Sequence, residues 1–257
     1  MSYLTFHLVF LLPPILGLLL TLPSLKRIGS DSRVHLALPL ICLIALTYTT
    51  PWDNYLVARE VWWYGPARVV ATIGYVPIEE YLFFLLQPLL TGLILYQYLG
   101  RYGLTSRPSS PWASWIGASV FFAITLLGGL LFIDGQTSTL YLALILIWAP
   151  PILAGMWLYD GTTLWALRLP ILVSTALPTV YLWIADAIAI RAEIWTISPE
   201  YTIGLAPLGL PLEEASFFLF TNLLVVHGIL LLLYGSHDAL SHPQTQLTAD
   251  ISTKGAP

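Results

Sequence analysis

Long apolar stretches separated by short polar segments set the pattern of the chain. Seven stretches are long enough to cross a bilayer as helices, which takes about 20 predominantly apolar residues each. We predict membrane spans at 3–22, 34–50, 75–99, 112–133, 139–157, 168–188 and 205–234. The segments between them contain the Gly, Pro and charged residues that punctuate helices. The pattern predicts an all-α membrane protein of about seven helices.

Composition and charge support this fold class. Of the 257 residues 57% are hydrophobic and 9% are charged, whereas about a quarter of a soluble domain is charged. The net charge of −4 gives no electrostatic basis for binding nucleic acid. The single cysteine, Cys42, rules out a disulfide framework or a cysteine-based metal site. No basic residue precedes the first stretch and no small-x-small cleavage site follows it, so we predict that it is the first span and not a signal peptide.

Basic residues are distributed unequally between the two sides of the predicted spans. The side reached after spans one, three, five and seven holds Lys26, Arg27, Arg33, Arg101, Arg107, Arg168 and Lys254. The other side holds Arg59, Arg68 and Arg191. Because basic residues favour the cytoplasmic side, we predict a multi-pass protein of the cell membrane with its N-terminus outside and its C-terminus in the cytoplasm. The polar tail, 236–257, is predicted to be disordered.

The chain resembles itself at a nearly constant displacement. Asp53, Trp62 and Pro66 recur 133 positions later as Asp186, Trp195 and Pro199. Pro13-Pro14-Ile15-Leu16 recurs as Pro150-Pro151-Ile152-Leu153. Pro77-Ile78-Glu79-Glu80-x-x-Phe83-Phe84 recurs 134 positions later as Pro211-Leu212-Glu213-Glu214-x-x-Phe217-Phe218. An ordered series of matches predicts a duplicated unit.

The duplication divides the chain into four parts. We predict a first repeat of three spans over 1–105, a joining helix over 106–135, a second repeat over 136–235 and the tail over 236–257. Three spans followed by one return the chain to its starting side, so the repeats are parallel about a pseudo-twofold axis along the membrane normal. The acids of both repeats then meet at one face, which the basic residues place outside, around a central cleft.

Six carboxylates near this cleft are the candidate catalytic groups: Glu214, Glu80, Glu213, Glu79, Asp186 and Asp53. A carboxylate at membrane depth costs on the order of 3 kcal/mol, so each needs a reason to be there. One reason is helix capping, since Pro followed by acids is a normal helix start.

Consecutive residues on a helix point about 100° apart, so only one glutamate of each pair can face the cleft. Glu80 and Glu214 share their helix faces with the polar residues further along, and are favoured. The other glutamate can cap the helix or pair with Arg59, Arg68 or Arg191. The aspartates can equally be interfacial loop residues.

Aromatic residues surround the aspartates, namely Trp52, Trp62, Trp63, Tyr64, Trp183 and Trp195. Tryptophan and tyrosine are common at membrane interfaces, which explains most of them. A cleft lined by acids and ring faces would also stabilise a carbocation, because the acid donates a proton and the rings hold the resulting charge.

The duplicated Pro-x-Glu-Glu-x-x-Phe-Phe unit, with its preceding Asp and intervening Trp, resembles the small integral-membrane lycopene cyclases. These occur as two subunits in some bacteria and as a fused chain in archaea and fungi. The resemblance covers roughly 3–99 and 139–234, and the fourth helix resembles the joining segment of the fused form. The second copy matches closely through Thr221-Asn222. The first copy departs from the motif at this point, with Gln87-Pro88 in place of Thr-Asn.

The resemblance implies a lycopene beta-cyclase that closes the ψ ends of lycopene to β-rings by way of γ-carotene, with acid catalysis and no redox change. It implies the six acids as catalytic groups. The implied substrate-binding residues are Phe83, Phe84, Phe217, Phe218, Trp62, Trp195 and Asn222. It implies carotenoid substrates within the lipid bilayer and is compatible with association with other carotenoid enzymes. No cofactor or metal is expected, and the chain has no Gly-x-Gly-x-x-Gly for a dinucleotide.

Other classes of membrane protein fit less well. A retinal-binding protein needs a lysine in its last span, and Lys26 and Lys254 lie outside the spans. A membrane prenyltransferase would carry Asp-rich magnesium motifs, which are absent from the sequence. Cyclases of longer carotenoids and carotenoid hydratases share the pattern. A proton-coupled transporter remains the main rival, although inverted repeats would suit it better than parallel ones. A purely structural protein fits the acids least.

Overall fold

Seven helical segments dominate the structure, a computed structural model that describes residues 1–29, 32–104, 108, 110 and 112–235. Within these residues, the segments long and apolar enough to cross a membrane are Tyr3–Leu20, Arg33–Ala58, Ile78–Tyr102, Ala113–Asp134, Thr137–Ala166, Arg168–Arg191 and Leu212–Tyr234. The predicted all-α membrane fold of seven helices is confirmed. The tail predicted to be disordered, 236–257, lies outside the described residues.

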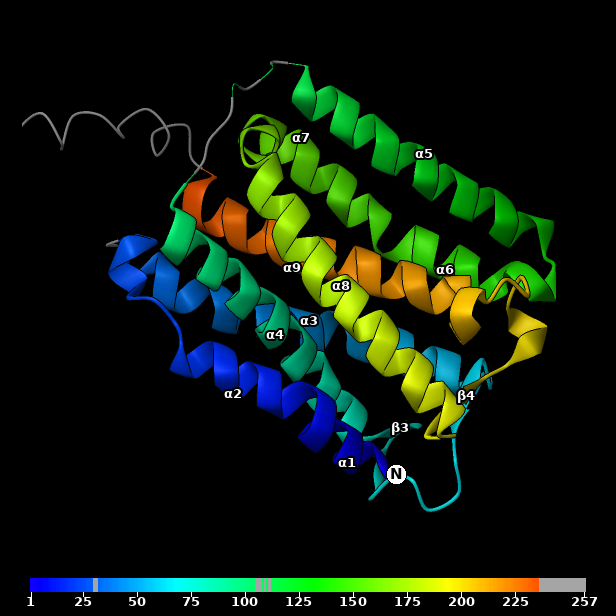
Figure 1. Cartoon of the computed structure of the whole chain (residues 1–257). Coiled ribbons are helices and arrows are strands. Elements are labelled where there is room, and N and C mark those ends of the chain that lie inside the picture. Colours follow the sequence, from blue (N-terminus) through cyan, green and yellow to red (C-terminus); the bar gives the residue numbers. More distant parts are fainter. Residues whose placement is uncertain (30–31, 105–107, 109, 111, 236–257) are drawn as a thin grey trace, which may run out of the picture.

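The first and fifth segments consist of several shorter helical pieces (Figure 1). In chain order the elements are α1 (Tyr3–Phe6), η1 (His7–Leu11), α2 (Leu12–Leu20), η2 (Leu25–Arg27), α3 (Arg33–Ala58), β1 (Trp62–Tyr64), β2 (Thr72–Ile73), β3 (Val76–Pro77), α4 (Ile78–Tyr102), α5 (Ala113–Asp134), η3 (Thr137–Thr139), α6 (Leu140–Trp148), α7 (Pro150–Ala166), α8 (Arg168–Arg191), β4 (Trp195–Ile197), η4 (Pro199–Tyr201), η5 (Pro207–Gly209) and α9 (Leu212–Tyr234).

Three span boundaries differ from the prediction by more than one helical turn. The second span was expected to end at residue 50, before Pro51, but α3 continues through this proline to Ala58. Proline is tolerated inside membrane helices because side chains and neighbouring helices satisfy the freed backbone groups. The fifth span continues to residue 166 instead of 157. The seventh begins as helix at residue 212 instead of 205, because the preceding residues form the turn η5.

The centre of the bundle is formed by α4 and α9, which contact each other and both contact α3 and α8. On the outside α2 packs on α4, and α7 packs on α9. The joining helix α5 lies along α6 and α7, at the edge of the bundle opposite α1 and α2 (Figure 1). Glycines allow this close approach: a Cβ atom at Gly117 of α5 would lie 2.1 Å from the Trp157 ring of α7.

Two short strands join the halves of the chain. β1 and β4 pair antiparallel, with Trp62 opposite Ile197, Trp63 opposite Thr196 and Tyr64 opposite Trp195. A displacement of 133 positions makes Trp63 and Thr196 equivalent, and these two lie directly opposite each other. The local twofold axis of the strand pair therefore relates equivalent residues, which supports the predicted twofold arrangement of the repeats.

A second pair of contacts between the halves has the same symmetry. The Tyr48 hydroxyl donates to the carbonyl of Trp148 at 2.9 Å, and the Tyr181 hydroxyl donates to the carbonyl of Phe10 at 2.6 Å. The two tyrosines are 133 positions apart, and the two acceptors 138. Each bond joins the second span of one repeat to the first span of the other.

The first span contains a π-helical turn, η1, whereas the equivalent part of the second repeat is the regular helix α6. Tyr3 stands ten positions before Pro13, whereas Tyr141 stands nine positions before Pro150. A π-helical turn absorbs one additional residue without displacing the helix on either side. Tyr3 and Tyr141 therefore take equivalent places in the two repeats despite the insertion.

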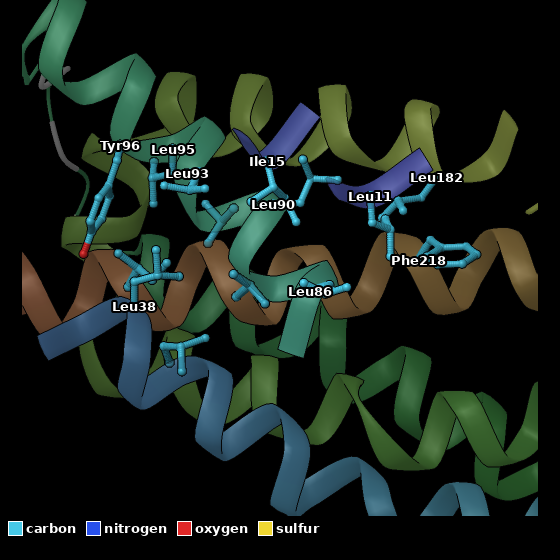
Figure 2. Close-up of a cluster of buried hydrophobic side chains, with 14 of the residues drawn as sticks. Leu11, Ile15, Leu38, Leu86, Leu90, Leu93, Leu95, Tyr96, Leu182 and Phe218 are labelled. Atoms are coloured by element: carbon cyan, nitrogen blue, oxygen red, sulfur yellow. The ribbon is translucent and has the colours of Figure 1, made fainter. Parts of the chain in front are cut away.

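The main apolar core lies where α2, α4, α8 and α9 meet (Figure 2). Leu11, Ile15, Leu90 and Leu182 are each at most 3% exposed. Their packing holds α4 beside α8 and α9, so the acidic starts of α4 and α9 are fixed near each other.

Candidate active site

One cavity of about 50 Å³ gathers four carboxyl groups from four different helices. Asp53 belongs to α3 and Glu80 to α4, and their repeat counterparts Asp186 and Glu214 belong to α8 and α9. Glu80 is half-buried and the other three are buried. β1 and β4 also contribute lining residues. The structure therefore brings one aspartate and one glutamate of each repeat to a single site.

Glu80 accepts hydrogen bonds from two phenols at one carboxylate oxygen. Its Oε2 atom lies 2.7 Å from the Tyr3 hydroxyl and 3.0 Å from the Tyr64 hydroxyl. The Tyr64 hydroxyl accepts in turn from Nε1 of Trp62 at 3.2 Å. Burial, together with the nearby Glu80 carboxylate, raises the pKa of the Tyr64 phenol well above its usual value. This phenol therefore remains a hydrogen-bond donor at neutral pH.

Glu214 has a matching but simpler partner. The Tyr141 hydroxyl donates to Glu214 Oε1 at 2.7 Å. Tyr141 begins the first span of the second repeat as Tyr3 begins that of the first. The position equivalent to Tyr64 is Ile197, which lines the cavity but has no side-chain donor. The two Glu–Tyr pairs are therefore alike in plan and differ by one hydrogen bond.

The aspartates lie within helices, and not in the interfacial loops that the sequence left open. Asp186 Oδ1 accepts from Nε1 of Trp195 at 2.9 Å. Among the described residues, the buried Oδ2 atoms of Asp53 and Asp186 have no hydrogen-bond partner. One oxygen of each aspartate therefore remains free to exchange a proton with a bound molecule.

Glu79 and Glu213 point away from this cavity and hold the preceding loops. Glu79 Oε1 accepts from the backbone amide of Val70, and Glu213 Oε1 accepts from that of Ile203, both at 2.8 Å. Neither residue lines the four-carboxyl cavity. The sequence left helix capping or pairing with an arginine for these glutamates, but both bonds instead go to backbone amides of the loops that precede α4 and α9.

Aromatic rings form most of the remaining cavity wall. Five of the predicted substrate-binding residues line it: Trp62, Phe83, Trp195, Phe217 and Phe218. The wall also includes Trp52, whose ring is stacked on Phe217 at 5.8 Å between centroids and on Trp148 at 4.6 Å.

A second, apolar cavity of about 200 Å³ adjoins the first. Phe83 and Phe217 line both cavities, and Phe84 lines only the second. The first cavity is too small for a bulky end group in this conformation, because bound small molecules usually occupy pockets of about 300 Å³ or more. Movement of the rings between the two cavities would enlarge it.

Asn222, the last predicted substrate-binding residue, belongs to a buried polar cluster deeper in the bundle. Its Oδ1 atom accepts from Gln87 at 2.5 Å and from Thr91 at 2.6 Å, and its Nδ2 atom donates to Thr179 at 2.9 Å. Neither cavity has Asn222 in its lining. These bonds link α4, α8 and α9, so they hold the helices together.

The cavity combines proton-carrying groups with ring faces and little room for water. Within the described residues no group of three or more His, Cys, Asp and Glu side chains is placed to hold a metal ion. Carboxyl groups held by phenols can give and take protons, and ring faces within about 6 Å of a cation stabilise it.

Sequence reasoning missed the three tyrosines that bind the glutamates. Tyr3 and Tyr141 are 138 positions apart, close to the 137 that separates the Pro-Pro pairs, so the repeat carried a signal for them. Tyr64 was read only as an interfacial aromatic residue. Its orientation depends on the pairing of β1 with β4, which no local pattern predicts.

Comparison with models of known protein families gave no match, and neither did comparison with solved structures. The chain is 38% identical to a lycopene beta-cyclase of Halobacterium salinarum over 236 residues, which is 90% of this chain and 95% of that protein. It is 35% identical to a bifunctional lycopene cyclase/phytoene synthase of Arthroderma gypseum, covering 89% of this chain and 41% of that protein. A protein of the same description from Blakeslea trispora is 34% identical over 88% of this chain. With this identity over nearly the full length of the archaeal protein, the chain belongs to the lycopene beta-cyclase family.

Proposed function

We propose that this protein closes the ψ ends of lycopene to β-rings, by way of γ-carotene, through acid catalysis without redox change. The observation that carries the proposal is the convergence of Asp53, Glu80, Asp186 and Glu214 on one aromatic-lined cavity. The name of the archaeal relative supports the same reaction.

The reaction needs one acid and one base. A proton adds to the terminal double bond of the ψ end and leaves a tertiary cation. The electron pair of a second double bond in the same end group closes the ring and moves the cation onto a ring carbon. Loss of a ring proton to the base forms the ring double bond. One proton enters and one leaves, so the product is an isomer of the substrate.

The glutamates are the proposed proton donors. Protonating an alkene requires a strong acid, and hydrogen bonds to a carboxylate stabilise the form left after the proton has gone. Tyr3 and Tyr64 supply such bonds to Glu80, and Tyr141 supplies one to Glu214. These bonds also fix the direction in which each carboxyl group points.

The aspartates are the proposed proton acceptors. Asp53 and Asp186 each present a buried Oδ2 atom without a partner among the described residues. An acceptor must reach the ring proton of a bound cation without first breaking a strong hydrogen bond. The free oxygen of either aspartate meets this requirement.

The rings hold the cation and exclude water from it. A cation over a ring face gains about 2 kcal/mol or more when both are desolvated. Phe83, Phe217 and Phe218 line the cavity together with Trp62 and Trp195. Water reaching the cation would give an alcohol in place of a ring, so a tight aromatic wall favours cyclisation.

Expression in a bacterium that accumulates lycopene tests the proposal directly. Pigments extracted from these cells should contain γ-carotene and β-carotene, whereas cells with the empty vector should contain lycopene alone. A protein with both Glu80 and Glu214 changed to glutamine, matched for membrane level, serves as the inactive control. Unchanged lycopene with the wild-type protein would refute the proposal, and hydroxylated products would reassign the protein to the hydratases.

We also propose that the acids lie toward the outer face of the cell membrane and that the C-terminus is cytoplasmic, since basic residues predominate on the opposite side. A C-terminal reporter that is active only in the cytoplasm should therefore be active. The fungal relatives are described as bifunctional lycopene cyclase/phytoene synthases, which supports an association of this protein with other carotenoid enzymes.

A further inference from the structure

The apolar cavity beside the acids lies between α3, α7 and α9 and opens to the outside of the bundle. Ile44 of α3 and Ile152 of α7 line it, and they are 47% and 42% exposed. In a membrane, side chains exposed on these helices face lipid. The cavity is therefore open to a molecule dissolved in the bilayer.

The apolar cavity and the acid cavity meet at a wall of stacked rings. Phe83 and Phe217 line both cavities. Trp148 stacks on Phe217 at 6.1 Å between centroids, with 14° between the ring planes. The Tyr48 ring also stacks on Trp148, with 5.2 Å between the centroids and 11° between the ring planes. Nearly parallel rings leave flat surfaces along which a planar conjugated chain can pack.

Away from the acids the groove continues along the same helices. A neighbouring hollow shares Ile41, Ile44, Ile152 and Met156 with the apolar cavity and extends to Leu231 of α9. From Glu214 to Leu231 are 17 residues, or about 26 Å at a rise of 1.5 Å per residue. An extended forty-carbon polyene is about as long as the hydrocarbon core of a bilayer, roughly 30 Å. The groove thus has nearly the length of the proposed substrate.

The equivalent place in the other half of the molecule is filled. There Ile15 stands where Ile152 lines the groove, and it is 3% exposed against 42%. Leu182 replaces Thr49 and is 1% exposed. Figure 2 shows Leu11 and Leu182 beside Phe218, and Ile15 beside Leu90, packed between the helices. The position beside α3, α7 and α9 is therefore hollow, whereas the residues described at its counterpart are packed.

We propose that the groove between α3, α7 and α9 binds the polyene tail of a single carotenoid, whose end reaches the acid cavity past Phe83 and Phe217. This inference rests on the proposed function and adds the site that holds the unreactive part of the substrate. It also fixes the route of entry, laterally from the lipid between α3 and α7.

A matched pair of substitutions tests the route. Ile44→Trp places a large ring in the mouth of the groove, and Leu177→Trp places the same ring at the repeat-equivalent position of α8, which is 58% exposed and lines neither the groove nor the acid cavity. Both are exchanges of exposed apolar side chains for tryptophan, so both proteins should fold. With protein amount normalised after detergent extraction, we expect Ile44→Trp to lower lycopene conversion about tenfold or more and Leu177→Trp to leave it within about twofold.

A second substitution tests the far part of the groove. A Cβ atom at Gly155 would meet nothing within 4 Å, so Gly155→Leu adds bulk to the hollow without a clash. Gly155 lies seven residues beyond Trp148, about 10 Å further from the acids. We expect Gly155→Leu to slow cyclisation of lycopene at least fivefold, while a shortened polyene with one ψ end, such as an apo-lycopenal, is cyclised at the wild-type rate.

The outcomes separate this inference from the function on which it rests. If the wild-type protein makes no cyclic carotenoid, the proposed function fails. If the wild-type protein cyclises lycopene but Ile44→Trp and Leu177→Trp behave alike, the groove is not the route. If Gly155→Leu slows the long and the short substrates equally, the far groove does not hold the tail.

Discussion

Glu214 differs from its neighbour Glu213 in what each carboxylate touches. Glu214 lines the acid cavity and accepts from Tyr141, whereas Glu213 accepts from the backbone of Ile203. We expect Glu214→Gln to abolish most cyclisation, because an amide cannot donate a proton to an alkene, while the folded protein is recovered in detergent at the wild-type level. Pigment analysis at matched protein amount measures the loss.

Glu213→Gln is the control for this prediction. An amide oxygen can still accept from Ile203, so the loop should stay in place and activity should remain near the wild-type value. Full activity of Glu214→Gln combined with loss in Glu213→Gln would move the proton donor to Glu213.

We expect the phenol hydroxyl groups to contribute to catalysis through their hydrogen bonds to the glutamates, and not only to packing. Tyr141→Phe removes the one phenol bond to Glu214 and keeps the ring, whereas Tyr3→Phe leaves Glu80 bound to Tyr64. A hydrogen bond to a charged group contributes roughly 1.5–3 kcal/mol, so Tyr141→Phe should lower the rate at saturating lycopene about tenfold or more. Tyr3→Phe should cost less. Equal rates for wild type and Tyr141→Phe would show that the bond is not used in catalysis.

For single residues, the sequence located the acids better than the tyrosines that donate hydrogen bonds to them. Burial cost and the repeat singled out six carboxyl groups, because a charge in an apolar helix is unusual in any context, and the structure brings four of them into one cavity. Tyrosine is common at the end of a membrane span, so the residue type of Tyr3 and Tyr141 does not mark them as partners of the glutamates. Only the three-dimensional position of α4 and α9 shows which phenol meets which carboxylate.

Among the elements, the π-helical turn η1 keeps Tyr3 in place despite one inserted residue. Deleting Val9, a 51% exposed residue of this turn, should convert it to α-helix and leave Tyr3 near Glu80. Deleting Ile147, at the equivalent position of the regular helix α6, should turn Tyr141 by about 100° and separate it from Glu214. We expect the first deletion to retain most cyclisation and the second to remove most of it, as measured by pigment yield per amount of folded protein. Loss in both would show that η1 is not an insertion that the helix tolerates.

The presence of each helix could be predicted from the length of its apolar stretch, but the residues at which the helices end could not. The second span was predicted to end at residue 50, yet α3 runs on through Pro51 to Ala58 and carries Asp53 inside the helix. The Thr50 hydroxyl donates to the carbonyl of Leu46 at 2.6 Å, and the Asn54 amide donates to the carbonyl of Thr50 at 2.9 Å. These carbonyls are not the one that Pro51 leaves without its helical donor, which is that of Thr47, and the hydropathy of a segment does not reveal whether a helix continues past a proline.

For the whole molecule, the joining helix α5 accounts for the difference between the two halves. Exact twofold symmetry would give two equivalent grooves, but α5 packs along α6 and α7 and lies far from α2 (Figure 1). Leu153 of α7 is fully buried on that side, whereas its counterpart Leu16 of α2 is 55% exposed. Because α7 packs on α5, a groove stays open between α7, α3 and α9. In the other half, α2 fills the related space. A sequence repeat cannot show this, because α5 has no counterpart in it.

One open groove has a consequence for the order of the reaction. All four carboxyl groups lie at one end of the bundle, and the groove leads away from them for about 26 Å along α9. The second ψ end of a bound lycopene is therefore far from the acids when the first end reacts. We expect γ-carotene to leave the protein, turn end over end in the lipid and bind again before β-carotene forms.

Isotope dilution measures this directly. Purified protein in lipid vesicles is given labelled lycopene together with an excess of unlabelled γ-carotene, and the label in β-carotene is followed while lycopene is consumed. Release of the intermediate predicts that unlabelled γ-carotene dilutes the label, so β-carotene formed early carries little of it and labelled γ-carotene accumulates. Transfer of the label to β-carotene without dilution would mean that both ends react in one binding event. The filled half of the molecule would then have to open during turnover, and the single groove would not set the order of the reaction.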